Sequence, residues 1–402
     1  MELAQIERAA RRLESVIHKT PVNTSRTFSV MSGAEIYLKC ENLQKTGSFK
    51  VRGAYNKIAR MAEEGQLPHL VAASAGNHAQ GVAYAAESVG AKATIVMPRS
   101  TPIAKISATE GYGAEIVLHG DGYDAAYERA RQICDEQGAT FVHPFDDEDV
   151  IAGQGTIALE ILQSMPTADA ILVPAGGGGL LAGIAACVKQ VNPRIKVFGV
   201  QAAGADAIAR SFREKHRVST ETSATIADGI AVRTPGEITT GIIQECVDDM
   251  VTVSDEEIAE AILLLLERTK LVVEPAGAVG VAAAINRKLP QLVGKRVVCV
   301  LSGGNIDVGF IQKVVEKGLI TRGRLIRFHT VMKDAPGSLQ RCSAIIAECG
   351  ANIIMVQHDR MHTNLQLGDA ILHVACEVSS AEHGRQLFRA LENEGYRIIL
   401  ES

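Results

Sequence analysis

The stretch AILVPAGGGGLLAG, residues 170–183, joins an apolar run to a second apolar run through four consecutive glycines. Residues 170–173 predict a buried strand, because a strand covered by helices on both faces is apolar throughout. Residues 178–190 predict a helix. Consecutive glycines are useful where the backbone must approach another group closely, and a helix N-terminus favours anions. We therefore expect Gly176, Gly177, Gly178 and Gly179 to hold a phosphate.

The same alternation of short β-branched runs and longer helical patterns extends from about residue 36 to residue 300. Strands are expected at 35–39, 70–73, 93–97, 115–118, 170–173, 196–200, 250–253 and 296–301, and helices at 77–89, 124–137, 178–190 and 255–269. This rhythm predicts an α/β protein with mostly parallel strands. Ligands of open parallel sheets bind at the carboxyl ends of the strands, so a site is expected there.

The pattern breaks at GLITRGR, residues 318–324, which reads as a short polar linker. Beyond it we expect strands at 325–332, 351–358, 366–377 and 396–400 and helices at 338–349 and 380–393. This βαββαβ order predicts a ferredoxin-like unit. The expected domains are 1–320, with a smaller subdomain at about 52–150, and 325–402.

Composition excludes several classes of protein. The 402 residues carry 41 Lys+Arg and 46 Asp+Glu, and no cluster of basic residues indicates nucleic-acid binding. Residues 1–15 predict an amphipathic helix rather than a signal peptide, and Pro68 and Pro174 interrupt the two long charge-free stretches, so no membrane span is expected. Small molecules are therefore the expected partners. Eight cysteines without a CxxC pair are typical of reduced thiols, which favours a cytoplasmic protein.

A lysine lies in an unusual place in GSFK, residues 47–50, where a strand turns through Gly47 into a helix. The positive end of a helix dipole and desolvation would both lower the pKa of Lys50 and free its amine for Schiff-base chemistry. Phe49 could then pack near a planar ring. The alternative is that Lys45, Lys50 and Lys57 are ordinary surface lysines.

Two further strand ends open on small residues. In ASAGNHAQG, residues 73–81, exposed backbone N–H groups could bind a carboxylate beside Asn77. The alternative is that Ser74 and Asn77 only cap the helix and that His78 is an ordinary first-turn residue. In LSGGN, residues 301–305, the hydroxyl of Ser302 would lie at the same sheet edge.

The glycine run also matches G-x-G-x-x-A at Gly177, Gly179 and Ala182, which suggests a dinucleotide site. Such a site normally has an acidic residue about 20 positions later, at the end of the next strand. Gln201 stands there instead. Dinucleotide binding is therefore the weaker interpretation of the glycines.

Six ordered motifs together resemble the fold type II pyridoxal-phosphate enzymes, and most closely the threonine/serine dehydratases. They are GSFK (47–50), ASAGNHAQG (73–81), PAGGGGL (174–180), TIADGI (225–230), VVEPAGA (272–278) and LSGGN (301–305). The resemblance covers about residues 5–320. The segments KDAPG (333–337) and GANIIMVQHDR (350–360) look like an ACT domain, an amino-acid-sensing module.

The resemblance implies a pyridoxal 5'-phosphate cofactor and a role for each matching residue. Lys50 would form the Schiff base, Phe49 would pack beside the ring, Asn77 would bond its 3-hydroxyl, Gly176 to Gly179 would cradle the phosphate and Ser302 would face the pyridine nitrogen. The substrate carboxylate would bind at Ser74, Ala75, Asn77 and His78. Asp228 and Glu274 match positions near the cofactor, but each could equally be a structural cap or partner.

The implied reaction is deamination of L-threonine to 2-oxobutanoate and ammonia, with L-serine as a second substrate. A neutral Ser302 hydroxyl favours prompt β-elimination, and Ala75 lacks the hydroxyl that serine racemases place there. Serine racemase/dehydratase activity, or an amino-acid-binding regulator with a vestigial catalytic domain, are the alternatives. Residues 201–207 lack the acidic pair that binds a cation in the racemase-like members, so no metal ion is expected.

The resemblance also implies a regulatory site and an assembly. Asp334, Gly337, Ser338 and Leu339 would bind an amino-acid effector such as isoleucine or valine, unless the ACT domain only dimerises. The family forms homo-oligomers, which implies a dimer or a tetramer. Whether the enzyme serves isoleucine biosynthesis or threonine breakdown is left open by the sequence.

Overall fold

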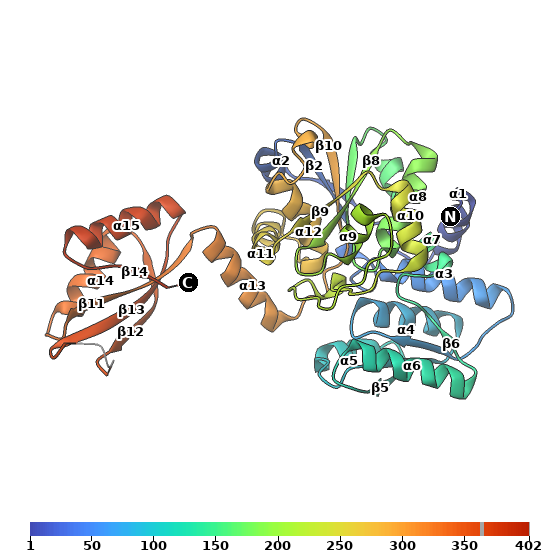
Figure 1. The fold of residues 1–402 in the computed structure, drawn as a ribbon, viewed down its shortest axis with the longest axis horizontal. Helices are drawn as coiled ribbons and strands as arrows, with labels where there is room; N and C mark the ends of the chain where they lie inside the picture. Colours follow the sequence, from blue (N-terminus) through green and yellow to red (C-terminus); the bar gives the residue numbers. More distant parts are fainter. Residues whose placement is uncertain (362–365, 402) are drawn as a thin grey trace. The chain divides into compact units, whose positions relative to one another are not determined.

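The computed structural model describes residues 1–361 and 366–401 and divides into two compact units, Met1–Val308 and Gly309–Ser402 (Figure 1). The division lies before the boundary that the linker at 318–324 suggested. Helix α13 (Val308–Thr321) runs into that stretch, and its apolar residues continue the helical pattern up to the glycine at 323.

The first unit contains a six-stranded sheet in the order β1-β2-β10-β7-β8-β9. The strands are β1 (Val22–Thr24), β2 (Glu35–Cys40), β10 (Arg296–Leu301), β7 (Ala170–Pro174), β8 (Lys196–Ala202) and β9 (Asp249–Val253). All neighbours are parallel except β1 and β2. β7 and all but the first residue of β10 are buried, as expected for strands covered on both faces.

A second, four-stranded sheet in the same unit is parallel throughout, in the order β5-β4-β3-β6. Its strands are β5 (Glu115–Leu118), β4 (Ala93–Met97), β3 (Leu70–Ala73) and β6 (Thr140–Phe141). Helices α4 (Asn77–Val89) and α6 (Tyr123–Gln137) contribute to separate apolar clusters that share this sheet. The two clusters show that helices cover both of its faces.

The remaining helices of the first unit surround the two sheets (Figure 1). They are α1 (Leu3–Leu13), α2 (Arg26–Ser32), α3 (Lys50–Glu63), α5 (Ile103–Glu110), α7 (Glu148–Ser164), α8 (Gly179–Val191), α9 (Ala207–Glu214), α10 (Glu237–Cys246), α11 (Asp255–Leu264) and α12 (Pro275–Ile285). Local signals set several of their ends: Asp147 caps α7, and Ser254 forms a capping box with Glu257 at α11. Among residues 1–361 and 366–401, no helix combines the length and apolar character that crossing a membrane requires.

The second unit confirms the expected βαββαβ order. Its elements after α13 are β11 (Leu325–Lys333), α14 (Ser338–Glu348), β12 (Asn352–Asp359), β13 (Asp369–Glu377), α15 (Ala381–Asn393) and β14 (Ile399–Leu400). The antiparallel sheet has the order β12-β13-β11-β14, and one apolar cluster joins it to α14 and α15. Residues 366–368, expected at the start of a strand, lie outside β13.

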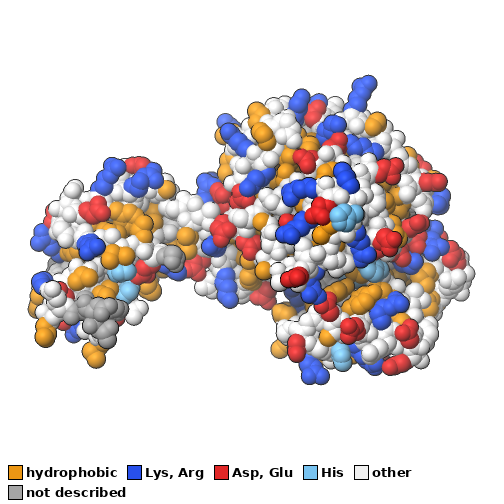
Figure 2. All heavy atoms as spheres, in the orientation of Figure 1, with side chains coloured by type: hydrophobic (Ala, Val, Ile, Leu, Met, Phe, Trp, Pro, Cys, Tyr) orange, Lys and Arg blue, Asp and Glu red, His pale blue; other side chains and the backbone are white. Residues whose placement is uncertain are grey.

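The surface carries both signs of charge. Figure 2 shows lysine, arginine, aspartate and glutamate side chains interspersed over the visible face, with no large region of one sign. This agrees with a formal net charge of only -5.

Candidate active site

Four strand-to-helix connections meet at one cavity of about 1060 Å³ in the first unit. Its lining includes residues of all four motifs that follow strand ends: Phe49 and Lys50, 73–78, Pro174 with 176–180, and Ser302. Three of the motifs follow β2, β7 and β10 and share one edge of the six-stranded sheet, where the carboxyl ends of parallel strands meet. Residues 73–78 follow β3 of the four-stranded sheet, so the expectation of a single sheet edge was wrong, and packing of the two sheets completes the cavity.

Lys50 is the first residue of α3, and its Nζ donates a hydrogen bond to the carbonyl of Pro144 at 2.8 Å. Burial lowers its pKa to about 8, although the carboxylate of Glu274 acts in the opposite direction. Nζ also lies 5.3 Å from the centre of the Phe49 ring. The structure thus places Lys50 in the cavity with a more available neutral amine, rather than on the surface.

The glycine run connects β7 to α8, and Gly178 has a positive φ of 99°. A Cβ atom at Gly177 would lie 2.3 Å from Cδ1 of Phe145, and one at Gly176 would lie 2.9 Å from the Cα of Ile230. Close packing against neighbouring residues therefore requires these glycines, in addition to any ligand. The first N–H groups of α8 have no partners within the helix and are available to an anion.

We expect Gly177→Ala to lower the free energy of unfolding by about 1–3 kcal/mol, because the new methyl group overlaps the Phe145 ring. Gly241→Ala in α10 is the matched control. Its Cβ would meet nothing within 4 Å, so this change should be neutral or slightly stabilising. Urea unfolding of both variants measures the difference, and equal stabilities would contradict the prediction.

A chain of amide and carboxylate side chains lies at the cavity. The Nδ2 of Asn77 donates to both carboxylate oxygens of Glu274, at 2.8 and 3.0 Å, and the Nδ2 of Asn305 donates to the Oδ1 of Asn77 at 2.9 Å. Burial raises the pKa of Glu274 to about 7, with a further contribution from Asp228. Asn77 is therefore held in place from both ends of its amide.

Glu274 should make folding depend on pH in a direction opposite to that of ordinary paired carboxylates. Its pKa is about 7 in the folded protein and 4.5 ordinarily. Between pH 4.5 and pH 7 the folded protein therefore holds a proton that the unfolded protein has lost. Stability from this group therefore falls as pH rises through that window. In cofactor-free protein, Glu274→Gln should gain stability relative to the wild type from pH 4.5 to pH 7. A constant difference across the window would refute the assignment.

Ser302 follows β10 and is almost completely buried at the cavity wall. Its carbonyl accepts a hydrogen bond from the N–H of Phe49 at 3.0 Å, and an isolated bridge pairs Ser48 with Gly303. These contacts tie the Lys50 segment to the end of β10. The Ser302 side chain is thereby brought to the same cavity as Lys50.

The turn of residues 74–78 also lines the cavity, with Gly76 as the N-cap residue of α4. The Oγ of Ser74 accepts from the N–H of Gly76 at 3.2 Å, and a Cβ at Gly76 would meet nothing within 4 Å. The ring of His78 is buried and its Nε2 donates to the carbonyl of Val142 at 2.9 Å. Burial, with a contribution from Lys50, lowers the pKa of His78 to about 3, so the imidazole is neutral.

Ion pairs that the motifs did not indicate lie at the cavity lining. Lys105 of α5 contacts Asp228 at 3.1 Å, and Arg233 pairs with Asp124 of α6. Both pairs connect helices of the four-stranded sheet to the loop around residues 228–233. Sequence reasoning missed these pairs because charged residues of this kind are common on any surface.

The expected effector residues lie in the second unit. Gly337 has a positive φ of 90°, α14 begins at Ser338, and Leu339 is exposed. The carboxylate of Asp334 pairs with Arg360 at 3.1 Å. The loop therefore has an open helix N-terminus, but its one acidic side chain already has a partner.

Fold and cavity together define an α/β enzyme in which a lysine and a glycine loop at a helix N-terminus line the same cavity. The chain belongs to the pyridoxal-phosphate dependent enzyme family, whose model matches residues 13–303. It is 48% identical over 396 residues to an L-threonine ammonia-lyase of Thermotoga maritima, covering 98% of each chain.

Solved structures agree with this membership. The processed form of threonine deaminase isoform 2 from Solanum lycopersicum matches with a TM-score of 0.75 at 37% identity, over 78% of this chain and 86% of that one. Maize serine racemase matches with a TM-score of 0.75 at 35% identity, over 79% of this chain and 98% of that one. The α/β fold expected from the sequence is thus confirmed.

Pyridoxal phosphate is the cofactor of this family, and the residues at the cavity fit it. The Lys50 amine can bond an aldehyde, and the start of α8 offers N–H groups to a phosphate. The dinucleotide interpretation is not supported, because Gln201 is buried and its Oε1 accepts from the N–H of Ala209.

Proposed function

We propose that this enzyme deaminates L-threonine to 2-oxobutanoate and ammonia by eliminating the β-hydroxyl, and also converts L-serine to pyruvate. Lys50, the glycine loop and the turn at 74–78 line the same cavity, and this arrangement is the main support for the proposal. Similarity to an L-threonine ammonia-lyase and to a threonine deaminase supports the same reaction class.

Lys50 is proposed as the general base that removes the α-proton of the substrate. Pyridoxal phosphate, when bound, supplies an electron sink for the charge left on the α-carbon. A pKa of about 8 leaves a useful fraction of Lys50 in the neutral form that can accept a proton near neutral pH. Phe49 packs beside the Lys50 side chain and helps to exclude water.

The turn at 74–78 is proposed to orient the substrate. Its exposed N–H groups at the start of α4 would bind the α-carboxylate, with Ser74, Ala75, Asn77 and His78 around it. Asn77 would also contact the cofactor ring, and the bonds that it makes to Glu274 and Asn305 would hold it there. Ser302 would present a neutral hydroxyl to the ring nitrogen, which favours elimination over a long-lived carbanion.

Release of 2-oxobutanoate from L-threonine by purified, cofactor-loaded protein is the direct test, with L-serine measured in parallel. We expect turnover of both substrates. Their relative rates measure how the cavity accommodates one methyl group, a difference of about 1–3 kcal/mol at most. No keto acid from either substrate would contradict the proposal.

Serine racemisation is the second candidate, favoured by the similarity to maize serine racemase. Ala75 argues against it, because its methyl side chain cannot deliver a proton to the substrate. Formation of D-serine from L-serine, detected by chiral chromatography, distinguishes the two reactions. D-serine formed faster than pyruvate would replace the proposed function by racemisation.

The second unit is proposed to be an ACT domain that binds an amino-acid effector near Asp334, Gly337, Ser338 and Leu339. The βαββαβ topology and the open N-terminus of α14 support this assignment. Isoleucine or valine should change the threonine concentration at half-maximal rate. Light scattering of the same sample should give a homodimer or homotetramer. We also propose a cytoplasmic location, which the free cysteines fit.

A further inference from the structure

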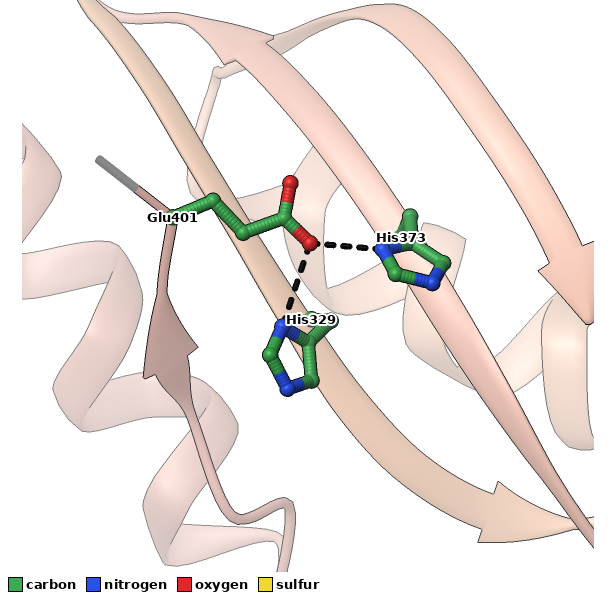
Figure 3. A group of neighbouring side chains, drawn as sticks. All are labelled: His329, His373 and Glu401. Carbon is green, nitrogen blue, oxygen red and sulfur yellow. Dashed lines mark hydrogen bonds and ion pairs between the residues drawn. The ribbon is translucent and has the colours of Figure 1, made fainter. Parts of the chain in front are cut away.

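Two histidines and a glutamate of the second unit lie together on its antiparallel sheet (Figure 3). His329 of β11 and His373 of β13 are directly opposite each other in the strand register. Glu401 follows β14, and its N–H donates to the carbonyl of Arg327 at 3.0 Å. Three separate segments of chain thus bring the group together on adjacent strands.

The three side chains converge on one point. The carboxylate Oε1 of Glu401 accepts from the Nδ1 of His373 at 2.6 Å and from the Nδ1 of His329 at 3.1 Å. All three candidate ligand atoms lie within 4.8 Å of one another. Donors that bind a tetrahedral zinc ion at 2.0–2.1 Å are about 3.3 Å apart, so small side-chain movements would admit an ion.

The group lies on the face of the sheet opposite α14 and α15. Phe328, Leu372 and Val374 flank the histidines along β11 and β13 and belong to the apolar cluster with α14 and α15. Because side chains alternate along a strand, His329 and His373 point away from those helices. Between a quarter and a third of each of the three side chains is exposed, which leaves access for an ion and for water.

The donor chemistry selects a class of ion. Two imidazole nitrogens and one carboxylate oxygen form the set found in many zinc sites, and imidazole also suits copper and nickel. Magnesium and calcium prefer oxygen ligands only. The guanidinium of Arg327 pairs with Glu316 of α13, so the positive charge of Arg327 is balanced by that carboxylate.

We propose that His329, His373 and Glu401 bind one divalent transition-metal ion of the zinc type, with water completing the coordination. Each imidazole would bind the ion through Nδ1, and the proton that Nδ1 donates to Glu401 in the structure would then be carried by Nε2. The ion would tie the end of β14 to β11 and β13. The sequence, judged from residues 201–207 of the first unit, predicts no metal ion, and this proposal departs from that prediction.

The test uses the full-length, cofactor-loaded protein after treatment with a chelator, titrated with ZnCl₂ in a calorimeter. We expect one ion per chain at this site. His373→Ala and Glu401→Gln should each weaken binding by at least about 100-fold, because loss of a direct ligand exceeds the loss of a supporting residue. His216→Ala is the matched control, since it removes an exposed histidine beside Glu214 and should leave binding unchanged.

A second measurement guards against misfolded variants and against binding by cysteines. Zn²⁺ should raise the unfolding temperature of the wild type and of His216→Ala, but not of the two ligand variants, whose circular dichroism should remain native. Co²⁺ should give visible bands without a thiolate charge-transfer band. Equal zinc affinity in the wild type and both ligand variants, no binding by the wild type, or a thiolate band would each overturn the proposal.

Discussion

Lys50→Ala will lower the rate of 2-oxobutanoate formation by about 10²–10⁴-fold or more, because it removes the proposed general base and the amine that bonds the cofactor. Among the residues that the structure describes, the Lys50 amine donates one hydrogen bond, to the carbonyl of Pro144, so the fold should survive its loss. Activity assays with L-threonine and an absorption spectrum of the bound cofactor measure the effect.

The matched control is Lys92→Ala, which removes an exposed ammonium group paired with Glu115 on the four-stranded sheet. This variant should keep the wild-type rate. Native circular dichroism for Lys50→Ala would show that its loss of activity is chemical. Full activity in that variant would reject both the Schiff-base role and the proposed reaction mechanism.

Arg52→Met is expected to have the largest effect on stability, about 3–5 kcal/mol, because it leaves the buried Glu41 and the partly buried Glu160 without their main partner. The fully buried guanidinium of Arg52 contacts Glu41 at 2.8 Å and Glu160 at 2.7 Å, and Lys39 completes the group. Burial alone would raise the pKa of Glu41, but Arg52 and Lys39 more than offset it and hold that pKa below 4.5.

Urea unfolding at several pH values measures this loss. Since the folded pKa of Glu41 is lowered, the stability that it contributes is present above pH 4.5 and is lost as pH falls through the folded value. The deficit of Arg52→Met should therefore shrink in acid. Arg210→Met, an exposed partner of Asp206, should cause no measurable change.

A double variant separates charge from packing. Glu41→Gln in the Arg52→Met background removes one of the stranded carboxylates and should recover part of the lost stability. A single Arg52→Met variant as stable as the wild type would mean that the buried network contributes nothing net to folding.

Most of the secondary structure could be predicted because its signals are local. The apolar runs at 70–73, 93–97, 115–118 and 296–301 match β3, β4, β5 and β10 to the residue. β1 and β6 escaped prediction, since strands of three and two residues are too short to show a period. Their pairing depends on neighbours that are distant in sequence.

The candidate site was predictable at the level of motifs but not of contacts. Lys50, the glycine run and Ser302 follow strands of the six-stranded sheet, so parallel topology brings these three to one edge. The turn at 74–78 follows β3 of the other sheet, and only the packing of the two sheets brings it to the same cavity. The bonds of Asn77 to Glu274 and Asn305 join residues about 200 positions apart. No local pattern indicates which of many polar side chains will meet at such a distance.

The sequence by itself determined the α/β character of the first unit, the βαββαβ order of the second, most strands and the residue types that carry the chemistry, because periodicity and turn residues act over a few positions. Only the tertiary structure decided the burial of Arg52 between two carboxylates, the raised pKa of Glu274 and the meeting of His329 with His373. These properties depend on strand register and on exclusion of water, which arise only when distant segments pack together.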